Sequence, residues 1–157
     1  MSDGSHFHNK RMETASADEL KAMQLERLQV TFRYVYQMNP AQHARFDEAN
    51  VDPEDIQSLD DLRKVPFMDK ELCRENYPLG LCCVERHMLA EMHMSSGSTG
   101  TPVVMPYTQS DLLQWAECMA RCYRMAGAEA GDTVQITPSF GLFTGGFGMY
   151  HGAWAVG

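Results

Sequence analysis

The residues best suited to chemistry gather in one short stretch, Met94–Pro102, with the sequence MSSGSTGTP. Glycines accept a positive φ at little steric cost, so a stretch of this composition can curl tightly. Successive backbone N–H groups can then converge into a concave anion site, with Ser and Thr hydroxyls as further donors. The composition therefore indicates a loop that could hold a polyphosphate. A plain turn or a flexible linker is the alternative, because Ser/Gly/Thr clusters serve as those too.

Two common phosphate-binding motifs do not account for the glycines of the chain. A Walker-type loop needs a lysine after its last glycine, and no lysine lies in or beside residues 94–102. A second glycine-rich run, Gly146-x-Gly148-x-x-x-Gly152, misses the dinucleotide-binding spacing by one residue. The acidic residue that should follow about twenty positions later would fall past residue 157. The run is therefore a weak dinucleotide-binding signal.

The order of residues in these two stretches resembles a known family. The run Ser95–Pro102 resembles the Ser/Thr-Ser-Gly-Thr-Thr-Gly-x-Pro loop of the adenylate-forming enzymes, and most closely that of the phenylacetate–CoA ligase family. Residues 140–153, FGLFTGGFGMYHGA, are similar to that family's Tyr-Gly-Leu-Phe-Thr-Gly-Gly run and the His-Tyr-Gly-Ala that follows it. The His-Tyr pair is reversed here, as Tyr150 and His151. Residues 65–67 and 75–80 also resemble the leader segment of that family. The resemblance therefore covers residue 25 to the end of the chain.

The resemblance implies an enzyme that activates an aryl acid with ATP and Mg²⁺ and then transfers it to coenzyme A. The implied partners are the aryl acid, ATP and CoA, and a homodimer is left open. No catalytic residue and no metal ligand is assigned within the chain. The implied ATP phosphate-binding loop is Ser95, Ser96, Gly97, Ser98, Thr99 and Gly100. The implied acyl pocket comprises Phe140, Gly141, Phe143, Thr144, Gly145 and Gly146, in a region that also opens a helix.

The chain departs from the family pattern in residues and in length. Thr101 stands where the family usually has a lysine, and Trp154 replaces a glutamate. The family's downstream adenine-binding, metal-binding and catalytic-lysine segments are not in the 157 residues. We therefore expect the truncated N-terminal portion of such a ligase, inactive alone. The alternatives are a truncated non-catalytic relative that binds a nucleotide or a protein, and an unrelated α/β domain with a fortuitous Ser/Gly turn.

Charge and cysteine content narrow the function classes. The net charge is −8, with no lysine or arginine run, so the basic face of a nucleic-acid binder is not expected. The longest apolar runs are too short to span a bilayer. The five cysteines form no Cys-x-x-Cys motif, and the first residues lack a signal-peptide pattern. These observations favour free thiols in a reducing cytoplasm.

Residues 1–84 are predicted to be a disordered start and a helical leader. Residues 1–16 are polar, and the pair His6 and His8 has no neighbours to complete a metal site. Over 17–84 apolar residues recur at three- and four-residue steps, and Asn39-Pro40 should end the first helix. Asp52, Ser58 and Asp69 are expected to begin further short helices as capping residues.

Residues 85–157 are predicted to begin a nucleotide-binding α/β domain. Alternation over 90–94 indicates a half-buried strand with Met92 inside and His93 on the polar side. A returning strand is expected at 103–107, a helix after Thr108, and a further strand at 133–137. Strand, helix and strand in this order suggest a crossover connection and a partly parallel sheet. The predicted fold class is therefore α/β: a helical leader, then the first strands and helices of the adenylate-forming large domain, incomplete.

Overall fold

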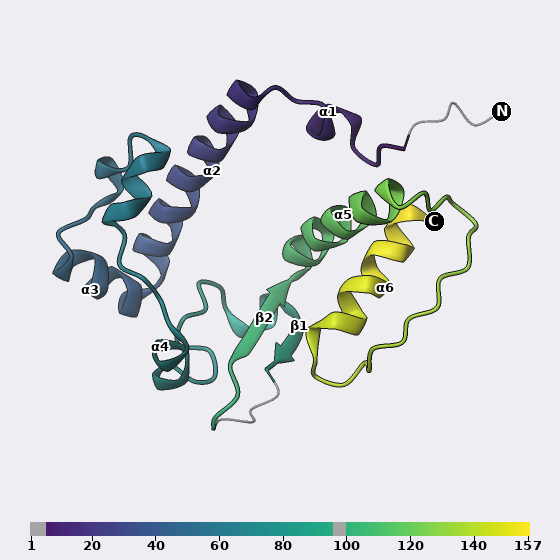
Figure 1. The fold of residues 1–157 in the computed structure, drawn as a ribbon. Coiled ribbons are helices and arrows are strands. Elements are labelled where there is room, and N and C mark those ends of the chain that lie inside the picture. The colour runs from purple at the N-terminus through teal and green to yellow at the C-terminus, as the bar shows by residue number, and fades with distance from the viewer. Residues whose placement is uncertain (1–5, 96–99) are drawn as a thin grey trace. The chain divides into compact units, whose positions relative to one another are not determined.

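The computed structural model describes residues 6–95 and 100–157 (Figure 1). Contacts divide the chain into two compact units. One is Ala15–Arg86, and the other joins the residues up to Thr14 with His87–Gly157. The helical leader predicted at 17–84 and the first unit differ by two residues at each end.

The unit Ala15–Arg86 consists of helices joined by short turns. Their bounds are α2 Ala17–Met38, α3 Pro40–Glu48, η1 Pro53–Asp55, η2 Leu59–Lys64 and α4 Lys70–Glu75, the η elements being 3-10 helices. Residues predicted to cap helices do so: Asp52 and Ser58 form capping boxes, and the Asp69 side chain accepts from Leu72 N. Hydrogen bonds to the Asp61 carboxylate hold its pKa well below its usual range, and the bond from Lys64 contributes more than the bond from Ser58.

The core of this unit is small and aromatic. Phe32, Phe46, Val51 and Ile56 are buried together, and the rings of Phe32 and Phe46 lie 4.6 Å apart. Burying each of these side chains contributes about 1.5–3 kcal/mol. The spacing of Leu28, Phe32 and Val35 that indicated a helix thus also identifies the face of α2 that packs inward.

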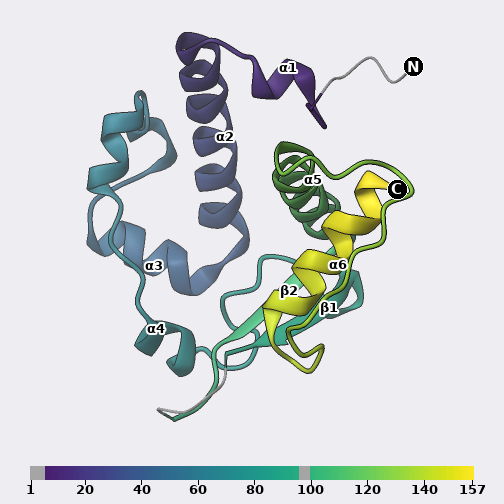
Figure 2. The same ribbon diagram turned by 45° about the vertical axis from the view of Figure 1, so that its right-hand side comes forward.

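The unit that contains His87–Gly157 is a β-hairpin with two long helices. Its elements are α1 Lys10–Glu13, η3 Arg86–Met88 at the unit boundary, β1 Leu89–Met94, β2 Val104–Thr108, α5 Gln109–Met125 and α6 Thr144–Val156. The strands are antiparallel, with His93 opposite Met105 and Met94 opposite Val104. Thr108 and Asp111 form the predicted capping box of α5. Figures 1 and 2 both show α5 and α6 side by side.

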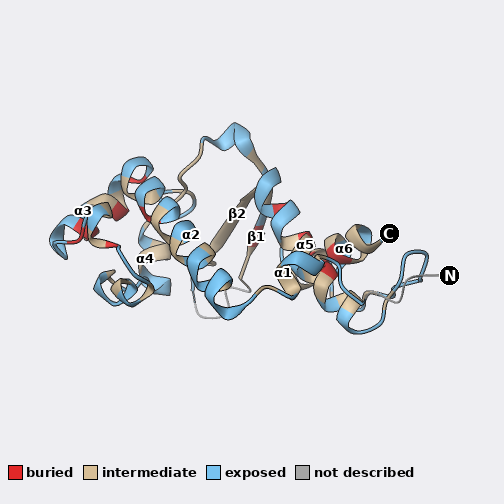
Figure 3. Ribbon diagram, turned by 90° about the horizontal axis from the view of Figure 1, so that it is seen from above, coloured by how far each residue is buried: buried red, intermediate tan, exposed pale blue. Residues whose placement is uncertain are grey.

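Glycines allow α6 to lie close against α5. A Cβ built on Gly148 would come within 2.4 Å of the Trp115 ring, and one built on Gly152 within 2.4 Å of the Met119 Cβ. Both helices carry buried residues (Figure 3). The run Gly148-x-x-x-Gly152, weak as a nucleotide signal, is thus explained by helix packing.

Three expectations for the backbone differ from the structure. Residues 133–137 form no strand: they run as a largely exposed segment between α5 and α6. The described strands form only the antiparallel pair β1–β2, so no parallel crossover is present there. A strand needs a neighbour for its N–H and C=O groups, and no described strand lies beside this segment. At the other end, α1 occupies part of the stretch predicted to be disordered, and Asn9 Nδ2 donates to Glu117 Oε1 at 2.7 Å.

No described helix is both long enough and apolar enough to span a membrane.

Candidate functional site

The base of the Ser/Gly-rich loop is closed by Ser95. Its backbone N–H donates to Val103 O at 3.0 Å, and its Oγ accepts from Val103 N at 2.9 Å. Ser95 thus joins the two ends of the hairpin loop, next to the last strand pair, Met94 and Val104. Gly100 has a φ of +132°, a conformation that favours glycine, and among the described residues none beyond its chain neighbour lies within 4 Å of its built Cβ. The predicted phosphate-binding residues Ser96, Gly97, Ser98 and Thr99 lie outside the described residues.

One backbone hydrogen bond joins this loop to the predicted acyl-pocket segment. Met94, the last residue of β1, donates its N–H to Leu142 O at 2.8 Å. Leu142 lies between Gly141 and Phe143, both named from the sequence as pocket residues. The two motifs are therefore adjacent in space although more than forty positions separate them in the chain.

The pocket segment is an exposed aromatic turn that leads into α6. Phe143 occupies the N-cap position of α6, and Thr144, Gly145 and Gly146 form its first turn. Phe140 and Phe143 are 44% and 55% exposed. The Phe140 ring lies edge-on to Phe147 at 5.4 Å and to Tyr150 at 6.4 Å. The predicted helix start is confirmed, and Phe147 and Tyr150 are additional aromatic neighbours.

Gly146 has a packing reason to be glycine. A Cβ on Gly146 would lie 2.9 Å from the Ser139 carbonyl oxygen, so a side chain there would push the turn away from α6. Gly141 has open space around its built Cβ. The roles of these residues in binding an acyl group stay a prediction.

The prediction for His93 is wrong: the side chain is buried, not on the surface. Strand β1 alternates as predicted but with the opposite face inward, so Met92 is 47% exposed and His93 only 1%. The register shifts between Leu89 and Glu91. One ring nitrogen of His93 has a polar partner on the same face, because His93 Nε2 lies 3.0 Å from Glu91 Oε2.

Aromatic rings enclose His93. Tyr107, Trp115 and Phe147 all present edge-on geometry to its imidazole, with centroids 5.2, 5.7 and 5.1 Å away. Burial raises the pKa of the Tyr107 hydroxyl, and the negative charge of Asp111 raises it by a smaller amount. Glu91 also reaches α6, where His151 Nε2 lies 3.0 Å from Glu91 Oε1. A sequence signal existed for this cluster: Glu91 and His93 are two apart on a strand and must share a face.

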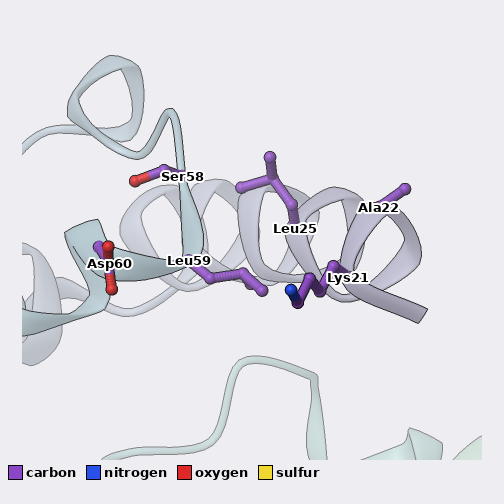
Figure 4. A pocket seen from close by; sticks show the side chains of 6 residues that line it. All are labelled: Lys21, Ala22, Leu25, Ser58, Leu59 and Asp60. Carbon is purple, nitrogen blue, oxygen red and sulfur yellow. The ribbon is translucent and has the colours of Figure 1, made fainter. Parts of the chain in front are cut away.

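Other described features do not add to this site. No group of three or more His, Cys, Asp or Glu side chains among the described residues is arranged to hold a metal ion. An open pocket of about 530 Å³ belongs to the helical unit and contains none of the predicted site residues (Figure 4). Its lining is Lys21, Ala22, Leu25, Ser58, Leu59 and Asp60.

Comparison with solved structures defines the class of fold. The chain superposes on a 2-hydroxyisobutyryl-CoA ligase in complex with 2-HIB-AMP and CoA, with a TM-score of 0.91 and 28% identity. The match covers 99% of this chain and 34% of that one. An open conformation of the same ligase, also with 2-HIB-AMP and CoA, gives a TM-score of 0.90. The fold is that of one part of the adenylate-forming CoA ligases.

Curated proteins with similar sequences share one name. Phenylacetate–coenzyme A ligases from Aromatoleum evansii, Pseudomonas putida and Escherichia coli are 47%, 44% and 42% identical to the chain over 146 residues. The match covers 93% of this chain, which spans about a third of the length of these relatives. No protein-family model matches the chain. The chain is thus homologous to phenylacetate–coenzyme A ligases over nearly all of its residues.

Proposed function

We propose that the chain provides the phosphate-binding loop and part of the acyl pocket of an AMP-forming ligase that joins a phenylacetate-like acid to coenzyme A. The observation that carries the proposal is the Met94 N to Leu142 O bond, which sets the two motif segments side by side. The names of the relatives, and the adenylate and CoA in the neighbouring structures, support the same reaction class.

In the proposed reaction the carboxylate of the acid attacks the α-phosphorus of ATP and pyrophosphate leaves. The thiol of CoA then displaces AMP from the acyl adenylate to form the thioester. Backbone N–H groups and hydroxyls of the loop, with Ser95 and Gly100 at its two ends, would hold the β- and γ-phosphates. Phe140 and Phe143 would pack against the aryl group, because exposed ring faces and edges suit a flat apolar ligand. Mg²⁺ would arrive with ATP.

The function is tested by replacing the matched third of the Aromatoleum evansii ligase with this chain. We expect the chimera to release pyrophosphate when it is given phenylacetate and Mg-ATP, because the chain would supply the binding elements that the replaced segment supplied. The unmodified ligase is the positive control. A chimera that folds and binds phenylacetate but releases no pyrophosphate would contradict the ligase function.

A second candidate is a binding module without turnover. Two observations favour it: Thr101 stands where the family usually has a lysine, and Trp154 at the end of α6 is 73% exposed. Such a module would bind Mg-ATP or another protein, and a homodimer is one form of that binding. We also propose a cytoplasmic location, because all five cysteines are free thiols.

Introducing a cation beside the loop should strengthen nucleotide binding. We expect Thr101→Lys in the chimera to lower the Kd for Mg-ATP about tenfold, because a charged donor near phosphate contributes about 1.5 kcal/mol or more. Isothermal titration measures the change. Thr101→Met is the uncharged control and should leave the Kd within about twofold. Equal affinities for all three proteins would show that position 101 is not near the phosphates.

A further inference from the structure

Glu91 joins two histidines that come from different elements. Its Oε2 lies 3.0 Å from Nε2 of His93 on the same strand, and its Oε1 lies 3.0 Å from Nε2 of His151 on α6. The exposed fraction of the side chain is 26% for Glu91, 19% for His151 and 2% for His93. Each carboxylate oxygen therefore serves one imidazole.

The protons of this cluster follow from its geometry. An ionised carboxylate only accepts hydrogen bonds, so both imidazoles must carry their hydrogen on Nε2. A neutral ring with Nε2–H leaves a lone pair on Nδ1. His93 Nδ1 is buried without a partner among the described residues. Leaving a lone pair unpaired there costs less free energy than leaving an N–H unpaired. Both rings are thus expected to carry a hydrogen on Nε2, and His93 to carry none on Nδ1.

The reversed pair Tyr150–His151 is what places an imidazole opposite Glu91. Consecutive helix residues point about 100° apart, so only one of the two positions can face β1. His151 faces Glu91, whereas Tyr150 is 50% exposed and contacts the Phe140 ring. In the order His-Tyr, which the family shows, an imidazole would instead stand at the Phe140 side.

We propose that Glu91, oriented by His93 on its own strand, is a positioning residue that clamps strand β1 to helix α6 through His151. Strand β1 ends at Met94, whose N–H holds Leu142 O, and α6 begins directly after the aromatic turn. The clamp therefore sets the separation between the base of the Ser/Gly-rich loop and Phe140–Gly146. That these segments hold ATP and an acyl group rests on the proposed function; the clamp itself does not.

The test is imidazole ¹⁵N NMR and amide hydrogen exchange on the full chain, without nucleotide. In the wild type both rings should show the Nε2–H tautomer. In Glu91→Gln the amide can accept from one ring but must donate to the other. That ring should be His151, which is the more exposed, and it should switch to Nδ1–H. The variant then holds His151 through a bond between neutral groups in place of one to a charged carboxylate, so exchange of the Met94 amide should accelerate about tenfold.

Glu117→Gln is the matched control, because Glu117 is also a half-buried carboxylate with two donors, Arg121 and Asn9, in the same unit. It should change neither the tautomers nor Met94 exchange. His151→Phe keeps an aromatic ring at this position but removes the hydrogen-bond donor to Glu91, so it should also accelerate Met94 exchange. This second variant tests the clamp if Glu91→Gln does not fold. An Nδ1–H tautomer in the wild type, or unchanged Met94 exchange in the folded variants, would overturn the clamp. Because no ligand is added, neither result depends on the proposed function.

Discussion

Gly152→Val is expected to destabilise the unit that contains α5 and α6 by about 3 kcal/mol. The built Cβ at Gly152 lies 2.4 Å from the Met119 Cβ and 3.1 Å from the Met119 carbonyl carbon. These atoms belong to or adjoin the α5 backbone, so no flexible side-chain end can move aside. Helix propensity works in the other direction, since leaving glycine gains up to about 1 kcal/mol. The steric term is larger, so the whole of α6 must shift away from α5.

Tryptophan fluorescence during urea unfolding measures this effect in one unit. Both tryptophans of the chain, Trp115 and Trp154, lie in α5 and α6. Gly141→Ala is the control, because no described residue beyond its two chain neighbours lies within 4 Å of the built Cβ, and its φ is not positive. It should change the unfolding free energy by less than about 0.5 kcal/mol. A Gly152→Val midpoint equal to that of Gly141→Ala would mean that the helices are not packed as closely as the structure shows.

Elements governed by local chemistry could be predicted from the sequence. Helix starts at Asp52, Ser58, Asp69 and Thr108 were predictable because a short polar side chain satisfies backbone N–H groups within its own turn. The hairpin strands were predictable from alternation and from the loop between them. Of the candidate site, the family resemblance named the loop residues and the segment 140–146, whereas their adjacency is seen only in the structure, in the bond from Met94 N to Leu142 O. The phosphate-binding and acyl-binding roles remain predictions.

Features decided by distant partners could not be predicted. Alternation along β1 gives two faces but not which is buried, and the choice depends on Glu91 meeting His151, sixty positions away. Apolar residues at 134 and 136 fit a strand, but a strand forms only where another edge accepts its hydrogen bonds. Residue types alone also do not reveal that Gly148 and Gly152 serve a helix contact rather than a ligand.

Asn39→Ala should destabilise the helical unit by about 2 kcal/mol. Asn39 is 1% exposed, and its Oδ1 accepts from Gln42 N at 3.0 Å as the N-cap of α3. Its Nδ2 donates to Gly80 O at 3.0 Å, which holds the turn after α4 against the helices. Losing the cap costs about 1 kcal/mol, and losing the hydrogen bond from the Asn39 amide to Gly80 O costs about 1 kcal/mol more.

Asn39→Asp separates these two contributions because it has the same shape. The carboxylate keeps the cap oxygen, and its charge suits a helix N-terminus, so a residue that served only as a cap would be tolerated or improved. Instead it turns an oxygen toward the Gly80 and Cys82 carbonyls, where Nδ2 donated before. We therefore expect Asn39→Asp to be about as unstable as Asn39→Ala at neutral pH, measured by amide exchange in α3 and at residues 80–82. Wild-type protection in Asn39→Asp would show that the bond to Gly80 contributes nothing and that Asn39 acts as a helix cap alone.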